Sequence, residues 1–103
     1  MSKIKLCSVY EDLDKYDCNN GNIVYCKKGT TIVHNPYGPA ILFKDGGKEY
    51  VIENKFHRLD GPARIWAGNE RYFINNKQLT KEEFEKHPER LKFLGKEYLI
   101  CLG

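Results

Sequence analysis

Apolar and polar residues alternate along several short segments of this 103-residue chain. Alternation with a period of two is typical of β-strands that bury one face. It predicts one strand at about 40–44 and another at about 48–53, joined by the glycine-rich turn 45–47. A second hairpin follows, with its tip at 68–69. The pattern therefore predicts consecutive antiparallel β-hairpins, each followed by a further turn, at 54–55 and at 75–76.

Two nearly identical heptads precede these hairpins. His34–Ala40 reads HNPYGPA, and 23 residues later His57–Ala63 reads HRLDGPA. Proline lacks an amide hydrogen and belongs at a strand start, and the preceding glycine allows a sharp entry. The segment 47–52, GKEYVI, also returns at 95–100 as GKEYLI. A catalytic motif is needed once, whereas recurrence at this period indicates stacked structural units.

The two ends of the chain have different patterns. Residues 1–22 predict an N-terminal strand followed by an acidic loop or short helical turn. Thr80 and Glu83 have the spacing of a helix capping box, and Pro88 disfavours helical geometry in the residue before it. We therefore expect one short helix near 81–86 and a closing strand at about 97–101. The expected organisation is a single domain, with the hairpins in 23–79 between segments 1–22 and 80–103.

Positional parity assigns the strand residues to two faces, because successive side chains point to opposite sides. One parity carries a regular apolar stripe, which we assign to the core: Leu42, Tyr50, Ile52, Ile65, Tyr72, Ile74, Tyr98 and Ile100. The other parity is mixed: Ile41, Phe43, Val51, Arg64, Trp66, Phe73 and Leu99. Exposed aromatic residues beside charges are typical of protein interfaces. The alternative is that Trp66 and Phe73 pack under the termini.

The mixed face supplies the expected partner-binding residues, which are Trp66, Arg64, Phe43, Arg71 and Phe73. Trp and Arg are among the residues that dominate binding energy at interfaces. Arg64 and Trp66 lie two apart on one strand, so their side chains point the same way. We expect Arg64→Glu to preserve the fold and to weaken binding. A second candidate is the acidic cluster of Glu11, Asp12, Asp14 and Asp17.

The polar residues of the second heptad are expected to brace a structural corner: His57, Arg58, Asp60, Gly61 and Pro62. In this interpretation His34 and His57 bond to backbone groups, and Arg58 pairs with Asp60. A zinc site needs three or four ligands at defined spacing, and the pattern supplies no third ligand. The acidic segment also lacks the glycine and glutamate of a calcium loop. We expect no catalytic residue, no metal and no cofactor.

Charge and cysteine content narrow the function further. The net charge of +3 is mild for a nucleic-acid-binding protein. Single-stranded nucleic acid stays an alternative partner, through Lys27, Lys28, Lys44, Lys48, Arg64, Arg71, Lys92 and Lys96. Cys7, Cys18, Cys26 and Cys101 show no metal-ligand spacing, and their flanks offer no activating group. With no signal peptide and no membrane span in the pattern, we expect free thiols and a cytoplasmic location.

The repeated unit resembles the MORN-variant repeats of HR-x-DGPA type, which recur in giant-virus, phage and bacterial antitoxin-like proteins. The resemblance covers about 23–79, with 95–100 added, and 23–34 reads as a degenerate leading half-unit. The first heptad departs from the family pattern at Asn35, Pro36 and Tyr37. The resemblance implies a mainly β protein, a twisted antiparallel sheet of MORN-like hairpins with a period of about 23 and a binding role. Such a protein would be a phage-encoded inhibitor of a host defence enzyme or an antitoxin-like immunity protein that acts by occlusion.

Overall fold

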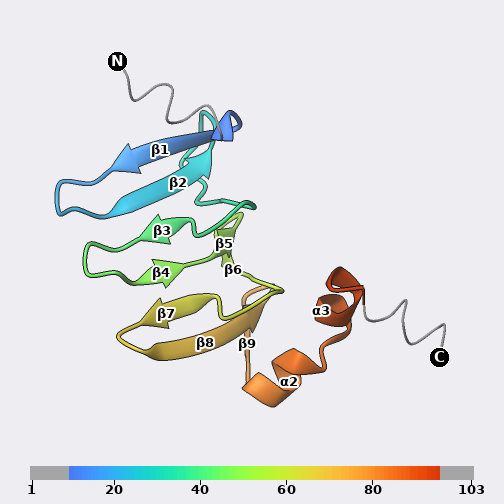
Figure 1. The fold of residues 1–103 in the computed structure, drawn as a ribbon. Coiled ribbons are helices and arrows are strands. Elements are labelled where there is room, and N and C mark those ends of the chain that lie inside the picture. The colour runs from blue at the N-terminus through green and yellow to red at the C-terminus, as the bar shows by residue number, and fades with distance from the viewer. Residues whose placement is uncertain (1–9, 96–103) are drawn as a thin grey trace.

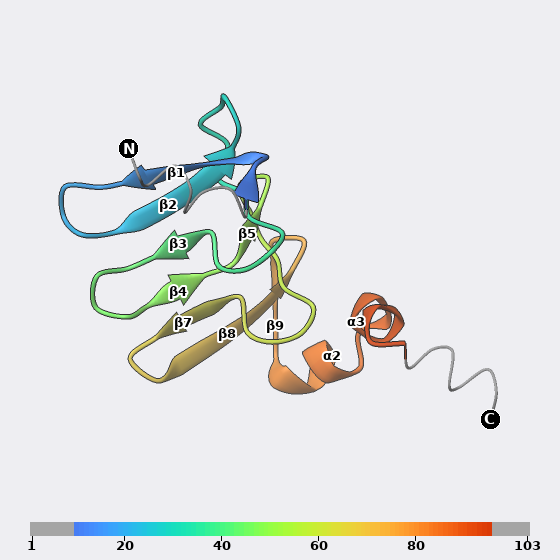
Figure 2. The same ribbon diagram turned by 45° about the horizontal axis from the view of Figure 1, so that its top comes forward.

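The computed structural model describes residues 10–95, and this part of the chain is mainly β. Figures 1 and 2 show the hairpins stacked as one ladder, with two short helices beside the last hairpin. The larger sheet is antiparallel and has the order β1-β2-β3-β4-β7-β8-β9, and β5 and β6 form a separate pair. The strands are β1 (Leu13–Asp17), β2 (Ile23–Lys27), β3 (Ile41–Leu42), β4 (Lys48–Glu49), β5 (Val51–Ile52), β6 (Lys55–Phe56), β7 (Arg64–Trp66), β8 (Asn69–Ile74) and β9 (Lys77–Leu79). The expected mainly β, antiparallel fold is confirmed.

The predicted strand at 48–53 is wrong in one respect, because it is divided between the two sheets. β4 pairs with β3 and β7, whereas β5 pairs with β6. Between them, the Tyr50 amide donates to the Ala63 carbonyl at 2.7 Å. The chain then turns at Glu53 and Asn54, which both have positive φ, one residue earlier than expected. The β5–β6 hairpin therefore leaves the main sheet and forms a separate two-stranded sheet.

The tip of the β7–β8 hairpin also lies one residue earlier than predicted. Ala67 and Gly68 have φ values of 45° and 83°, and Asn69 already belongs to β8. Positive φ at both central residues is the geometry of a two-residue hairpin turn whose twist matches that of its strands. The turn expected at 75–76 is confirmed, since Asn75 and Asn76 have φ values of 52° and 70°.

The acidic segment is only partly the expected loop: Glu11 and Asp12 form a turn, but Asp14 and Asp17 lie in strand β1. β1 pairs with β2 over all five of its residues, from Leu13 opposite Lys27 to Asp17 opposite Ile23. Leu13 is buried, and most of the other side chains of β1 are exposed. Charged residues suit a strand at the border of a sheet, where they discourage pairing with other chains. Because β1 has few apolar side chains, the alternation of apolar and polar residues did not predict it.

The C-terminal part of the described chain contains two helices, where one was expected. In α2 (Lys81–Glu85) Thr80 and Glu83 form the predicted capping box, with bonds of 3.1 and 2.9 Å. α3 (Pro88–Phe93) was not predicted, although Pro88 occupies a first-turn position where proline is favoured. Phe84 is buried, and its ring lies 4.6 Å from that of Tyr72. The expected N-terminal and closing strands lie outside the described residues.

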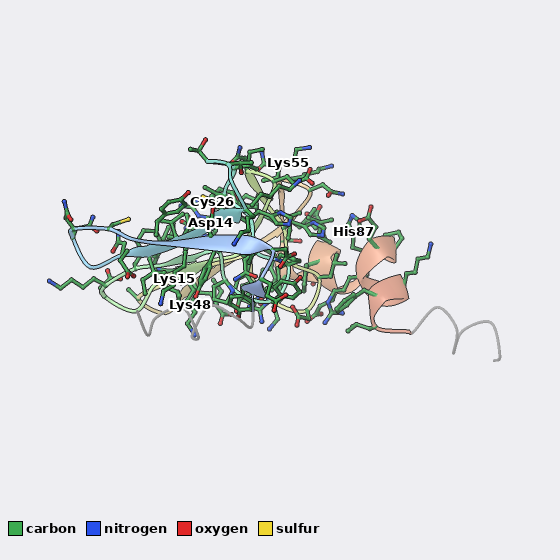
Figure 3. The ribbon with its side chains drawn as sticks, turned by 90° about the horizontal axis from the view of Figure 1, so that it is seen from above. Asp14, Lys15, Cys26, Lys48, Lys55 and His87 are labelled. Atoms are coloured by element: carbon green, nitrogen blue, oxygen red, sulfur yellow. The ribbon has the colours of Figure 1, made fainter. Side chains whose placement is uncertain are left out.

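Strand register defines two faces of the main sheet. A cross-strand row on the arginine face runs through Tyr16, Val24, Ile41, Glu49, Arg64 and Arg71. The neighbouring row, on the opposite face, runs through Asp17, Ile23, Leu42, Lys48, Ile65 and Glu70. We call this the tyrosine face, because Tyr25 of β2 and Tyr72 of β8 also lie on it. Figure 3 shows Asp14 and Cys26 on one side of the sheet and Lys15 and Lys48 on the other.

The predicted core stripe is largely wrong. Ile74 is buried, but Leu42, Tyr50, Ile52, Ile65 and Tyr72 keep partial exposure, and Tyr98 and Ile100 lie outside the described residues. Val51 and Phe73, assigned by parity to the mixed face, are 5% and 8% exposed. The reason is that the chain leaves the main sheet at Tyr50. The β5–β6 hairpin then covers the part of the arginine face that contains Phe73. The Phe56 ring packs against that of Phe73 at 5.0 Å.

Candidate protein-binding face

Two of the predicted partner-binding residues, Phe43 and Trp66, lie over the same glycine on the arginine face. A Cβ added to Gly47 would stand 2.7 Å from Cδ1 of Trp66 and 3.3 Å from Cδ2 of Phe43. The turn is closed by the Phe43 amide, which donates to the Gly47 carbonyl at 2.9 Å. Both rings are half-buried. Gly47 therefore lets two aromatic rings, 23 residues apart in the sequence, share one patch.

Arg64 is held among aromatic rings and a carboxylate. Its guanidinium carbon lies 4.1 Å from the Trp66 ring centroid and 4.6 Å from that of Phe56. Its Nε donates to Oε2 of Glu49 at 3.1 Å. Because Glu49 is only 7% exposed, Arg64→Glu would bring two carboxylates together in a poorly solvated position. The expectation that this substitution preserves the fold is therefore not supported by the geometry.

Glu49 is the residue that sequence reasoning missed. Burial of a charged group is costly unless it is paired and hydrogen-bonded, so the presence of Arg64 on this face called for a partner. The partner became identifiable only with the register, which places Glu49 opposite Arg64.

Arg71 and Phe73 lie on the same strand but have different surroundings. The register places Arg71 opposite Arg64, and its exposed side chain makes no hydrogen bond or ion pair with other described residues. Phe73 is only 8% exposed and packs against Phe56, so little of its side chain is accessible to a partner. The accessible patch consists of Phe43, Arg64, Trp66 and Arg71.

The acidic cluster does not form one surface. Asp14 accepts from the Gly29 amide at 2.7 Å, and Asp12 accepts from the Tyr37 hydroxyl at 2.9 Å. The latter bond raises the pKa of the Tyr37 hydroxyl above its ordinary value. Asp14 and Asp17 stand on opposite faces of the sheet, because they are three apart on β1. Much of the cluster therefore stabilises the neighbouring loops.

The residues expected to brace the corner make the expected contacts. Nδ1 of His57 accepts from the Asn75 amide at 2.9 Å, and Nδ1 of His34 accepts from the Glu53 amide at 3.0 Å. Arg58 Nε donates to Asp60 at 2.8 Å. Burial lowers the pKa of His57, and the charge of Glu89 opposes this effect. Both histidines use one ring nitrogen for structure, which disfavours a role as metal ligands at that nitrogen.

Arg58 of the second heptad makes two further contacts. Nη1 of Arg58 donates to the Pro62 carbonyl at 3.0 Å, and the guanidinium lies 3.9 Å from the Tyr50 ring centroid. A Cβ added to Gly61 would stand 2.8 Å from Cζ of Arg58. Gly61 therefore leaves space for the guanidinium that bridges the corner.

The described residues contain no group of three or more His, Cys, Asp or Glu side chains arranged to hold a metal ion. Cys18 and Cys26 are free thiols, and burial raises the pKa of Cys26, which disfavours the reactive thiolate. Within 10–95, no helix has the length and apolar character to cross a membrane.

The basic residues considered for nucleic-acid binding do not follow one track. Nζ of Lys27 lies 2.7 Å from a carboxylate oxygen of Glu53, which lowers the pKa of Glu53. Lys28 lies 3.9 Å from Asp14. Lys48 stands on the tyrosine face, opposite to Arg64 and Arg71. Several of these charges are therefore partly neutralised or point in different directions.

Comparisons with known proteins gave no match: no family model fits the chain, and it matches neither a curated protein nor a solved structure.

Proposed function

We propose that this protein is a non-enzymatic protein-binding module that acts by occlusion, and that it uses the patch of Phe43, Arg64, Trp66 and Arg71. The observation that carries the proposal is the arrangement of two aromatic rings over Gly47 beside a stacked arginine. Aromatic and arginine side chains held in place lose little conformational freedom on binding and are enriched at interface centres.

The electrostatics of the patch favour a partner with an acidic contact region. Arg64 is already neutralised by Glu49, whereas Arg71 is exposed and has no partner among the described residues. An acidic group of a target placed against Arg71 would supply the opposite charge that Arg71 does not find among the described residues. A protein-binding module of this kind would be a small inhibitor of a host enzyme or an antitoxin-like immunity protein. Either would act in the cytoplasm.

The test is a comparison of two charge reversals on opposite faces of one sheet. Arg71→Glu changes the proposed patch, and Lys48→Glu makes the same change in charge on the tyrosine face. Proteins retained by the immobilised wild-type chain are purified, and their affinities are measured by calorimetry. We expect Arg71→Glu to weaken binding of the target about tenfold or more, as at interface hot spots, and Lys48→Glu to leave it unchanged. An affinity of Arg71→Glu equal to that of the wild type would show that this face is not the interface.

The same variants separate protein binding from nucleic-acid binding. A polythymidine oligonucleotide titrated at low salt tests the alternative partner directly, because phosphate contacts make such binding strongly salt-dependent. Tight binding of the oligonucleotide that both charge reversals weaken would favour a nucleic-acid-binding protein. We expect no such binding, since the basic residues lie on both faces.

A further inference from the structure

A cavity of about 270 Å³ lies between the corners formed by the two heptads, away from the arginine face. None of its lining residues belongs to the patch of the proposed function. The first heptad contributes 35–38, and the second contributes 57–60. Tyr50, Ile52 and Phe93 complete the walls.

The first corner holds an aromatic stack where the second holds an arginine. In the second corner Arg58 lies over the Tyr50 ring. In the first, the Tyr10 ring meets Tyr25 edge-on, with 5.3 Å between centroids. Tyr10 then stacks on Tyr37 with a centroid distance of 5.3 Å and an interplanar angle of 6°. Because of this difference between the heptads, one wall of the cavity contains Tyr37, whose ring is supported by Tyr10.

Tyr37 is fixed in orientation and yet open to solvent. Its hydroxyl donates to Asp12 at 2.9 Å, and Tyr10 covers one face of its ring. The residue is nevertheless 57% exposed, and Phe93, another wall of the cavity, is 59% exposed. Tyr10 does not line the cavity, so Tyr37 meets it through the rest of its ring. A ring held in this way can stack on a ligand with little further loss of freedom.

The charges within the cavity wall are satisfied internally. Arg58 and Asp60 pair with each other at 2.8 Å, and Nδ1 of His57 is occupied by the Asn75 amide. Apolar surface comes from Pro36, Ile52 and Leu59. The lining therefore fits a neutral group better than an ion. An apolar cavity of about 150 Å³ is enough for benzene, and drug-sized sites begin near 300 Å³, so the volume suits one aromatic side chain.

We propose that this cavity binds a neutral aromatic side chain, tyrosine or tryptophan, presented by a protein partner. The incoming ring continues the stack of Tyr10 and Tyr37 and packs against Phe93. The proposal rests on the proposed function in one respect only, which is that the partner is a polypeptide. It adds a second contact surface and names the chemistry of the group recognised there.

The experiment uses blocked pentapeptides of known sequence. The full-length protein is titrated by NMR with acetyl-Gly-Gly-Trp-Gly-Gly-amide, its leucine counterpart and free 3-methylindole. We expect the tryptophan peptide to bind more tightly than the leucine peptide, and 3-methylindole to bind about as tightly as the tryptophan peptide. Tyr37→Ala and Phe93→Ala should each weaken its binding about three- to tenfold, the range for the loss of one aromatic pair. Tyr37→Phe, which keeps the ring, should retain most of the affinity.

Tyr16→Ala is the matched control, because Tyr16 is also an exposed tyrosine, at 45%, and does not line the cavity. It should leave peptide binding unchanged. The proposal is overturned if the leucine peptide binds as tightly as the tryptophan peptide, or if Tyr37→Ala and Phe93→Ala fold and bind like the wild type. Binding of 3-methylindole much tighter than that of the tryptophan peptide would show that the cavity excludes a flanking peptide backbone, and would assign it to a free small molecule instead.

Failure of this proposal can be told apart from failure of the proposed function. Arg71 does not line the cavity, so Arg71→Glu should not change peptide binding. A target whose affinity falls with Arg71→Glu, while no aromatic peptide binds, would retain the proposed function and remove the cavity as a contact site.

Discussion

Glu49 and Arg64 form an ion pair across neighbouring strands, with 3.1 Å between Oε2 of Glu49 and Nε of Arg64. The side chains are 9% and 29% exposed, so both charges are largely removed from water. Removing one partner of such a pair leaves an uncompensated charge, whereas replacing both by apolar residues is often neutral.

Glu49→Ala should therefore lower the free energy of unfolding by about 2–3 kcal/mol, somewhat less than for a fully buried pair. Arg64→Glu should cost at least as much. The double variant Glu49→Leu/Arg64→Met should recover most of the loss. Urea denaturation followed by tryptophan fluorescence measures all three. A double variant that is less stable than either single variant would contradict the assignment of the loss to an unpaired charge.

Gly61→Ala should destabilise the protein more than Gly38→Ala, although the two glycines occupy the same heptad position. A Cβ at Gly61 would displace the Arg58 guanidinium, whereas a Cβ at Gly38 meets only the Tyr10 hydroxyl at 3.8 Å. Neither glycine has a positive φ, so the backbone conformation tolerates alanine at both positions. We expect a loss of about 1.5–3 kcal/mol for Gly61→Ala, the value of a charged hydrogen bond, and a change near zero for Gly38→Ala. Thermal unfolding of the pair measures the difference, and equal melting temperatures would rule out the bracing role of Arg58.

Thr80→Ala should cost about 1 kcal/mol, as for other helix caps. The hydroxyl accepts from the Glu83 amide, and the Glu83 carboxylate accepts from the Thr80 amide. Thr31→Ala is a suitable control, because Thr31 is an exposed threonine outside any helix. The free energy of unfolding from urea titration is the readout. If both alanine variants had the same stability as the wild type, the capping box would contribute nothing to the fold.

Stability should fall as the pH is lowered through the range in which His57 titrates. Burial depresses the pKa of folded His57 below its ordinary value of 6.5, so the unfolded chain takes up this proton more readily. The contribution of His57 is therefore fully present above about pH 6.5, and it is lost as the pH falls from there through the lower folded pKa.

His57→Gln provides the comparison for this pH dependence. The glutamine oxygen can accept the bond from the Asn75 amide but does not titrate, so the variant should lose less stability between pH 7.5 and pH 5 than the wild type does. Urea midpoints at several pH values measure the difference, and NMR titration of the ring protons gives the folded pKa directly. A folded pKa above 6.5 would reverse the predicted sign.

On the arginine face, the sequence predicted some side-chain contacts and missed others. Parity placed Arg64 and Trp66 together, because they are two apart on one strand, and the structure keeps them in contact. Phe73 was assigned to the same face and is indeed on it, but the β5–β6 hairpin covers it. The cover is formed by Phe56, which no alternation rule links to Phe73. Parity can assign a side chain to a face, but it cannot say what packs over that face.

The sequence by itself determined the features whose partners are close along the chain. The capping box joins residues three apart, the 75–76 turn needs only residues that tolerate positive φ, and the Arg58–Asp60 pair spans two positions. Tertiary structure decided the division of the chain between two sheets at Tyr50, the pairing of Glu49 with Arg64 and the strand made from the acidic segment. These depend on register and on packing between distant segments, where the energy lies in burial and in long-range pairing rather than in the preferences of neighbouring residues.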